Sequence, residues 1–175
     1  MTNFLRMAAV AATAAAVAVT AAPAAAAPVG VTTGAKPTAN ARIIKPLALT
    51  RVRDLDFGTI VMNTVASGGE TVALTAGGGF TCGSGGLACS GTNQTARYNV
   101  RGTNNQVVVV AATNVTLNGS NGGSLTFVPA VPGNVTLTSS GAPGNDFDVG
   151  GSITIVPGTI DGVYIGDMEV TVDYL

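Results

Sequence analysis

The stretch that decides the fold is residues 160–175, IDGVYIGDMEVTVDYL. From residue 164 onward, polar and acidic side chains fill most odd positions, and the even positions carry apolar or aromatic side chains apart from one glycine: Tyr164, Gly166, Met168, Val170, Val172 and Tyr174. This period of two is typical of a β-strand with one face in a core and the other in water. We expect one long strand from 164 to 174. Such a strand must pair with something, because an unpaired edge exposes backbone hydrogen-bonding groups.

The remainder of the chain indicates an all-β protein. Short apolar or alternating runs recur between turns rich in Gly, Asn and Ser, at residues 71–75, 96–101, 107–111, 115–117, 125–127, 135–137, 147–149 and 153–155. The run at 107–111 is apolar throughout and predicts a strand buried on both faces. The segment 54–61, DLDFGTIV, is expected to bury Leu55 and Phe57 and to turn at Gly58. No window beyond the first 26 residues shows helical spacing, so we expect an antiparallel, immunoglobulin-like β-sandwich of short strands.

The N-terminal region is expected to direct export. Residues 1–26 contain one charge, Arg6, then an apolar run at 7–19 and a small-residue stretch, AAPAAAAP. This layout is typical of a secretory signal peptide, with cleavage after Ala26, and we expect no membrane span after its removal. Residues 27–45 then form an N-terminal extension and residues 46–175 the sandwich. Within the extension, the alternation of Ala39, Ala41 and Ile43 predicts a modest strand, which Pro46 interrupts.

Charge and cysteine content indicate which classes of function and which covalent links to expect. Charged residues make up 10% of the chain, and without Arg6 seven basic residues face nine acidic ones. That balance argues against nucleic-acid binding, which calls for a basic patch. Five of these seven basic residues lie before position 54, and six of the nine acidic ones lie after position 145. Cys82 and Cys89 lie in a glycine-rich loop, and in an exported protein we expect them to form a disulfide.

Catalytic and cofactor chemistry is not expected. The chain has no histidine and two cysteines, which excludes histidine-based triads and an ordinary zinc site. The carboxylate pairs Asp54/Asp56 and Asp146/Asp148 would suit acid–base chemistry or Ca²⁺. Because they alternate with the apolar residues Leu55 and Phe147, we interpret them as pointing to water. We therefore predict a protein that is not an enzyme and has no cofactor or metal.

Two short sets of residues resemble known families. The segments IIKPLALT at 43–50, DLDFGTI at 54–60 and MEVTVDY at 168–174 resemble bacterial secreted proteins of domain-of-unknown-function family 4402. In addition, Gly162 is fourteenth from the C-terminus and Tyr174 is penultimate. A glycine and a tyrosine at these positions of an alternating strand resemble the C-terminal motif of chaperone–usher pilins.

The pilin resemblance implies a pilin-like sandwich that lacks its final strand and is completed by a strand from a neighbouring subunit. It implies an acceptor motif at the C-terminus, formed by Gly162, Tyr164, Met168, Val170, Val172 and Tyr174. The donor strand would carry Ala39, Ala41 and Ile43, which are smaller than the residues usual at donor positions. Expected partners are other copies or related subunits, with a periplasmic chaperone and an outer-membrane usher. Backbone pairing supplies affinity in such complexes, and alternate side chains fill pockets.

The expectation is thus an exported structural or adhesive surface subunit, fimbria-like, in the periplasm, at the cell surface or outside the cell. The alternative is a monomeric secreted sandwich that completes itself, with residues 39–50 paired inside its own fold. In that case the protein would be a binding module whose ligand contacts loops around residues 77–93 or 139–146.

Overall fold

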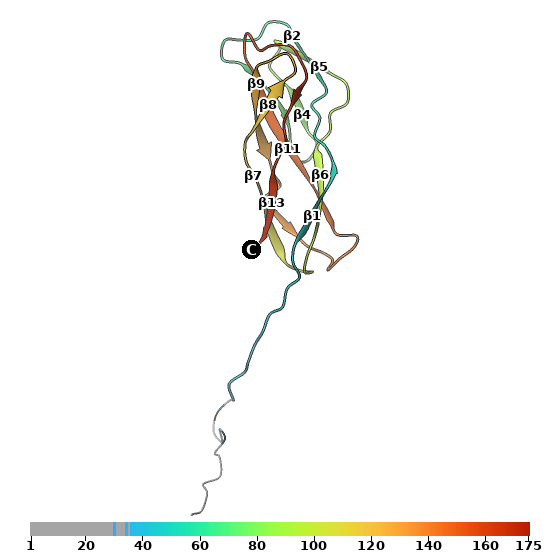
Figure 1. The fold of residues 1–175 in the computed structure, drawn as a ribbon, viewed down its shortest axis with the longest axis vertical. Coiled ribbons are helices and arrows are strands. Elements are labelled where there is room, and N and C mark those ends of the chain that lie inside the picture. Colours follow the sequence, from blue (N-terminus) through green and yellow to red (C-terminus); the bar gives the residue numbers. More distant parts are fainter. Residues whose placement is uncertain (1–29, 31–33, 35) are drawn as a thin grey trace, which may run out of the picture. The chain divides into compact units, whose positions relative to one another are not determined.

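The computed structural model describes residues 30, 34 and 36–175. These residues form β-strands and no helix (Figure 1). Residues 1–26, the expected signal peptide, lie outside the described residues. The strands are β1 (Ala48–Arg53), β2 (Thr59–Met62), β3 (Glu70–Leu74), β4 (Phe80–Cys82), β5 (Leu87–Ser90), β6 (Ala96–Arg101), β7 (Val107–Ala112), β8 (Val115–Gly119), β9 (Ser124–Ala130), β10 (Asn134–Thr136), β11 (Asn145–Ile155), β12 (Tyr164–Ile165) and β13 (Val170–Tyr174).

The fold is an antiparallel β-sandwich, as the sequence predicts. Its larger sheet has the order β1-β6-β11-β9-β8-β12, and β3 joins β11 and carries β4 on its other side. A three-stranded sheet, β10-β7-β13, and a two-stranded sheet, β2-β5, complete the fold. All strand pairs are antiparallel.

Two apolar clusters fill the sandwich. The first contains Tyr98, Val100, Val108, Leu137, Phe147 and Val149, against which Val170, Val172 and Tyr174 of β13 pack. The second contains Val72, Leu87, Leu125, Phe127, Ile153 and Ile155, against which Phe57, Ile60 and Tyr164 pack. Leu55 and Met168 contact both clusters. The segments that carry these two residues therefore both lie where the two halves of the core join.

The terminal stretch differs from the expected single strand. The alternation is confirmed, because Tyr164, Met168, Val170, Val172 and Tyr174 are all half-buried and their odd-numbered neighbours are exposed. The prediction of one continuous strand is wrong: β12 pairs with β8 in the larger sheet, whereas β13 pairs with β7 in the three-stranded sheet. Residues 166–169 cross between the sheets. A Cβ at Gly166 would lie 2.7 Å from the carbonyl oxygen of Thr116, so the crossing runs close to β8.

Three other apolar runs differ from their prediction. The runs at 147–149 and 153–155 belong to one strand, β11, which continues through Gly150 and Gly151. A Cβ at Gly150 would collide with the carbonyl of Leu74, and one at Gly151 with the ring of Phe127, so these glycines permit close packing. The run at 107–111 is buried on one face alone, since Val109 is 38% exposed.

The remaining differences concern the N-terminal extension and the cysteine loop. Residues 36–47 form no strand, so the strand predicted at Ala39, Ala41 and Ile43 is absent, and the first strand starts at Ala48. Residues 42–175 form one compact unit, and residues 36–41 belong to a separate one. The cysteine loop, expected to be irregular, contains β4 and β5 on either side of its glycines.

Candidate binding groove

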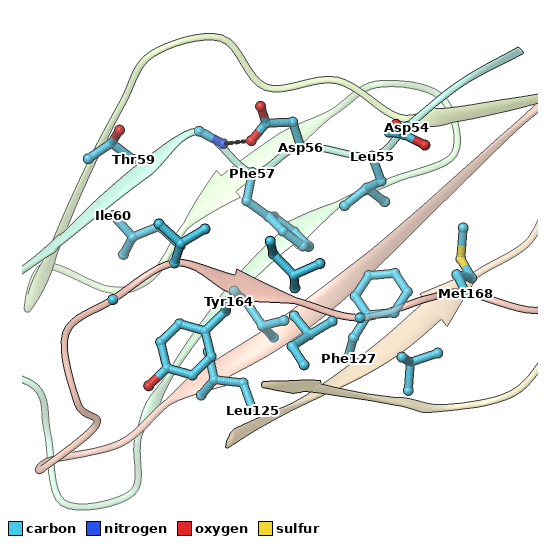
Figure 2. A pocket seen from close by; sticks show the side chains of 18 of the residues that line it. Asp54, Leu55, Asp56, Phe57, Thr59, Ile60, Leu125, Phe127, Tyr164 and Met168 are labelled. Atoms are coloured by element: carbon cyan, nitrogen blue, oxygen red, sulfur yellow. Dashed lines mark hydrogen bonds between the residues drawn. The ribbon is translucent and has the colours of Figure 1, made fainter. Parts of the chain in front are cut away.

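A groove of about 1020 Å³ opens between residues 51–62 and residues 159–168 (Figure 2). It is lined by side chains of the second core cluster, among them Leu125, Phe127, Ile153 and Ile155. Phe57 and Ile60 line it from the segment around β2, and Tyr164 and Met168 line it from the segment around β12. The core residues lie at the floor of the groove and are buried, whereas the residues of its two walls, Phe57, Ile60, Tyr164 and Met168, are half-buried.

Strands with unused pairing capacity border this groove. Both β2 and β12 line it. Within the described residues, β2 pairs with β5 alone and β12 with β8 alone. The next strand along the chain, β13, likewise pairs with β7 alone. An edge of this kind presents free N–H and C=O groups and can bind another extended chain.

The rim of the groove is acidic and partly apolar. Four acids line it, Asp54, Asp56, Asp161 and Asp167, together with two arginines, Arg51 and Arg53. Both arginines already have partners. Arg51 forms an ion pair with Asp54, and Arg53 donates hydrogen bonds to the carbonyl and the hydroxyl of Thr95, each 2.8 Å long. The apolar part of the rim includes Val163 and Ile165, which are 64% and 68% exposed.

The sandwich is closed at the other end of β13. The hydroxyl of Tyr174 donates to the carbonyl of Lys45 and accepts from the backbone N–H of Thr103, both at 2.7 Å. Lys45 is held further by its backbone N–H, which donates to the hydroxyl of Thr103, and by its ammonium group, which donates to the carbonyl of Ser140. None of these residues lines the groove. The chain entering β1 is therefore fixed to the end of β13, away from the groove.

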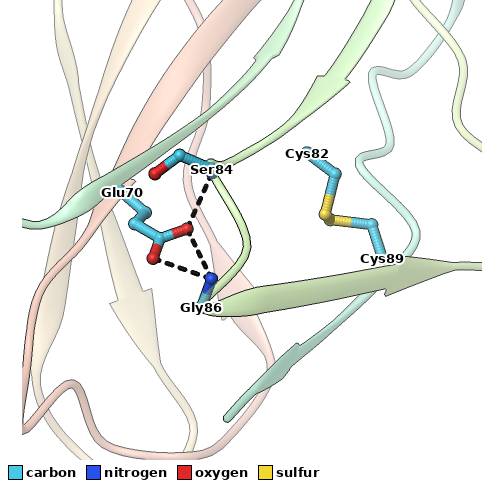
Figure 3. Close-up of a disulfide and its surroundings, with 5 residues drawn as sticks. All are labelled: Glu70, Cys82, Ser84, Gly86 and Cys89. Carbon is cyan, nitrogen blue, oxygen red and sulfur yellow. Dashed lines mark hydrogen bonds between the residues drawn. A yellow bond between two sulfur atoms is a disulfide. The ribbon is translucent and has the colours of Figure 1, made fainter. Parts of the chain in front are cut away.

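The predicted disulfide is present, between Cys82 and Cys89 (Figure 3). A buried acid, Glu70, holds the loop between these cysteines. Its side chain is 6% exposed, and its carboxylate accepts hydrogen bonds from the N–H of Ser84 at 2.8 Å and from that of Gly86 at 2.9 and 3.1 Å. The role of Glu70 could not be predicted from the sequence, because one acid at the start of a strand carries no sign of burial.

The carboxylate pairs have structural partners. Asp148 forms a bidentate ion pair with Arg97 at 2.7 and 2.8 Å, so it does not simply point to water as expected. The hydrogen bond from Arg97 is the main cause that lowers the pKa of Asp148, and the same bond raises the pKa of Arg97. Asp146 accepts from the amide of Asn99 at 2.6 Å. Asp56 accepts from the N–H of Gly58 at 2.8 Å, which holds the turn predicted at that glycine.

The structure divides the residues of the expected acceptor motif between two places. Gly162, Tyr164 and Met168 line the groove. Val170, Val172 and Tyr174 lie on β13 and pack against the first core cluster. The expected donor residues are exposed, and Ile43 is 91% exposed. What sequence reasoning missed is the contribution of residues 54–62, whose apolar side chains were assigned to the core alone.

The fold and the groove define an all-β sandwich protein with an apolar groove between two strand edges. The chain belongs to the family described as Domain of unknown function (DUF4402), whose model matches residues 47–174. No curated protein and no solved structure gives a significant match. The resemblance to chaperone–usher pilins finds no support in these comparisons and rests on Gly162 and Tyr174.

Proposed function

We propose that this protein is an exported structural or adhesive surface subunit, pilin-like in its assembly, whose groove accepts an extended strand donated by another copy. The observation that carries the proposal is the groove, because core side chains line it and strands paired on one side alone border it. A strand placed there would gain backbone hydrogen bonds from an edge and would cover Phe57, Ile60 and Tyr164, which line the groove and are half-buried. This is the physical basis of recognition by β-strand addition.

Charge favours the N-terminal extension as the donor. Residues 27–44, which precede the fixed Lys45, contain two basic residues, Lys36 and Arg42, and no acid. The groove rim carries four acids and two arginines, and therefore has more negative than positive charge. Opposite charges guide two chains together and fix their register. The described part of the extension, including Ala39, Ala41 and Ile43, forms no strand and is available for pairing.

The position of Lys45 favours donation between copies. Tyr174 fixes Lys45 at the end of the sandwich away from the groove. To fill its own groove, the extension would have to span the distance from Lys45 to the groove at the other end of β13. Donation to a second copy does not depend on that span. Such a contact joins two different surfaces, so repeated donation builds an open chain of subunits.

A monomeric binding module is the second candidate. This candidate is favoured by β1, whose residues 48–53 pair with β6. Part of the segment 39–50 is therefore already paired within its own sandwich. In this alternative the groove would take an extended segment of a different protein. Both candidates are non-enzymatic.

The distinguishing experiment examines the exported protein by SDS electrophoresis without boiling. Strand donation predicts a ladder of multiples of the subunit mass that collapses to one band on boiling. A single monomer band before boiling, at concentrations where the protein is soluble, would contradict donation and support the monomeric module.

A further inference from the structure

The wall of the groove that contains β2 has few backbone connections to the rest of the sandwich. β2 pairs with β5, and within the described residues this two-stranded sheet pairs with no other strand. The bridge nearest to it, between Asp56 and Gln94, joins the two segments that lead into and out of the same sheet. The position of this wall therefore depends on packing and on contacts outside the strand ladders.

Two such contacts tie the wall to the larger sheet. The first is covalent: the disulfide joins Cys89 of β5 to Cys82 of β4, and β4 pairs with β3 of the larger sheet. The second is Glu70 of β3, whose carboxylate accepts hydrogen bonds from Ser84 and Gly86 in the loop that leads into β5. Figure 3 shows the two contacts on either side of this loop.

The Glu70 contact reaches β2 through Gly86. The carbonyl of Gly86 accepts a hydrogen bond of 2.9 Å from the N–H of Asn63, directly after β2. A Cβ at Gly86 would collide with both the Glu70 carboxylate and the carbonyl of Thr64. The loop is thus packed tightly between Glu70 and the end of β2. A buried carboxylate without these donors would be left unsatisfied, which is costly, so Glu70 holds the loop firmly.

We infer that Glu70 and the Cys82–Cys89 disulfide act as two fastenings of the β2 wall and thereby control how tightly the groove retains a donated strand. This inference rests on the proposed function. Glu70 is a positioning residue, since it does not line the groove. If the position of the wall and the binding of the strand are coupled, removing either fastening weakens the binding of the strand. By the same coupling free energy, a bound strand stabilises the fastening.

The test uses the full exported chain and measures how fast its multimers dissociate in SDS at a fixed temperature. The two test variants are Glu70→Gln and the double variant Cys82→Ser with Cys89→Ser. The control is Thr71→Ala on the same strand β3, which removes a side-chain hydrogen bond of 3.2 Å to Thr154 of β11. It keeps the backbone carbonyl of Thr71, which accepts a hydrogen bond from Gly83 in the cysteine loop. We expect each test variant to dissociate at least about fivefold faster than wild type, and the control to match wild type.

A second measurement detects the same coupling through the ease with which the disulfide is reduced. Dithiothreitol reduces the disulfide to two thiols and is itself oxidised to its cyclic disulfide. We expect the wild-type multimer to require a higher ratio of reduced to oxidised dithiothreitol for half-reduction than the wild-type monomer released by heating and refolded by dilution.

The outcomes separate the two proposals. If wild type forms no multimers, the proposed function fails. If multimers form but both test variants dissociate at the wild-type rate, strand donation stands and the fastening inference is overturned. An equal acceleration in Thr71→Ala would also overturn it, because the effect would then follow general destabilisation. Should the cysteine variant fail to fold, Glu70→Gln and the dithiothreitol measurement decide alone.

Discussion

The hydroxyl of Tyr174 donates a 2.7 Å hydrogen bond to the carbonyl of Lys45, which joins the last strand to the residue where the N-terminal extension ends. The same hydroxyl accepts from the N–H of Thr103. This arrangement closes the sandwich at one end of β13, while the groove remains open beyond the other end of that strand. It also fixes Lys45, the last residue of the extension, at the end of β13 away from the groove.

The first prediction concerns this closure. Replacing Tyr174 with Phe removes both hydrogen bonds and leaves the N–H of Thr103 without its partner, so we expect the free energy of unfolding to fall by about 1–3 kcal/mol. Urea denaturation measures this value. The matched control is Tyr164→Phe, which loses one exposed hydrogen bond to the carbonyl of Ile160 and should change stability less. Equal losses in the two variants would contradict a special role for Tyr174.

A second prediction separates assembly from stability. Ile165 lies on the groove rim and is 68% exposed, so Ile165→Glu should leave the free energy of unfolding within about 0.5 kcal/mol of wild type. Under a donated strand it would bury a charged group in place of an apolar side chain, which is costly, and we expect it to abolish the multimer ladder. Val128→Glu is the control, because Val128 is 46% exposed on β9 and does not line the groove. A normal ladder from Ile165→Glu would exclude the groove as the binding site.

A third prediction concerns acid stability. Arg97 lowers the pKa of Asp148 in the folded protein, so this ion pair stabilises the fold fully above the unfolded pKa of about 4. Its contribution is lost as the pH falls through the lower, folded pKa. Asp148→Asn should therefore be less stable than wild type at neutral pH, and the difference should shrink below pH of about 4. Unfolding curves at a series of pH values test this, and a constant difference would contradict it.

A fourth prediction addresses export. If residues 1–26 are a signal peptide, the mass of the protein recovered after export should correspond to a chain that begins at Ala27. Intact-mass spectrometry gives the answer directly. A mass that retains Arg6 and the apolar run at 7–19 would contradict cleavage.

Much of the strand pattern could be predicted from alternation alone. The break between β12 and β13 could not, because Tyr164, Met168 and Val170 keep one register of inward-facing residues while the chain crosses from one sheet to the other. Periodicity indicates which side chains of a strand face the core, but it does not indicate which other strand lies beside it. The merging of two runs into β11 was missed because Gly150 and Gly151 read as a turn, although they serve close packing.

The groove could be predicted in part. Its C-terminal wall follows from the alternation around Tyr164, whereas its other wall depends on the position of β2, which pairs with a strand inside the cysteine loop. Such a pairing between short, distant segments leaves little trace in the sequence. The role of Glu70 was unpredictable for the same reason, since its partners are backbone N–H groups.

Complementation of two defective variants tests strand donation most directly. A chain that lacks residues 27–44 keeps its groove but has no donor, and Ile165→Glu keeps its donor but has a blocked groove. Each variant alone should remain a monomer in SDS without boiling. Mixed during refolding, the two should form a one-to-one heterodimer and no larger species, because donor and acceptor are each used once. Absence of the heterodimer, with both variants folded, or a ladder formed by the truncated chain alone, would contradict the account.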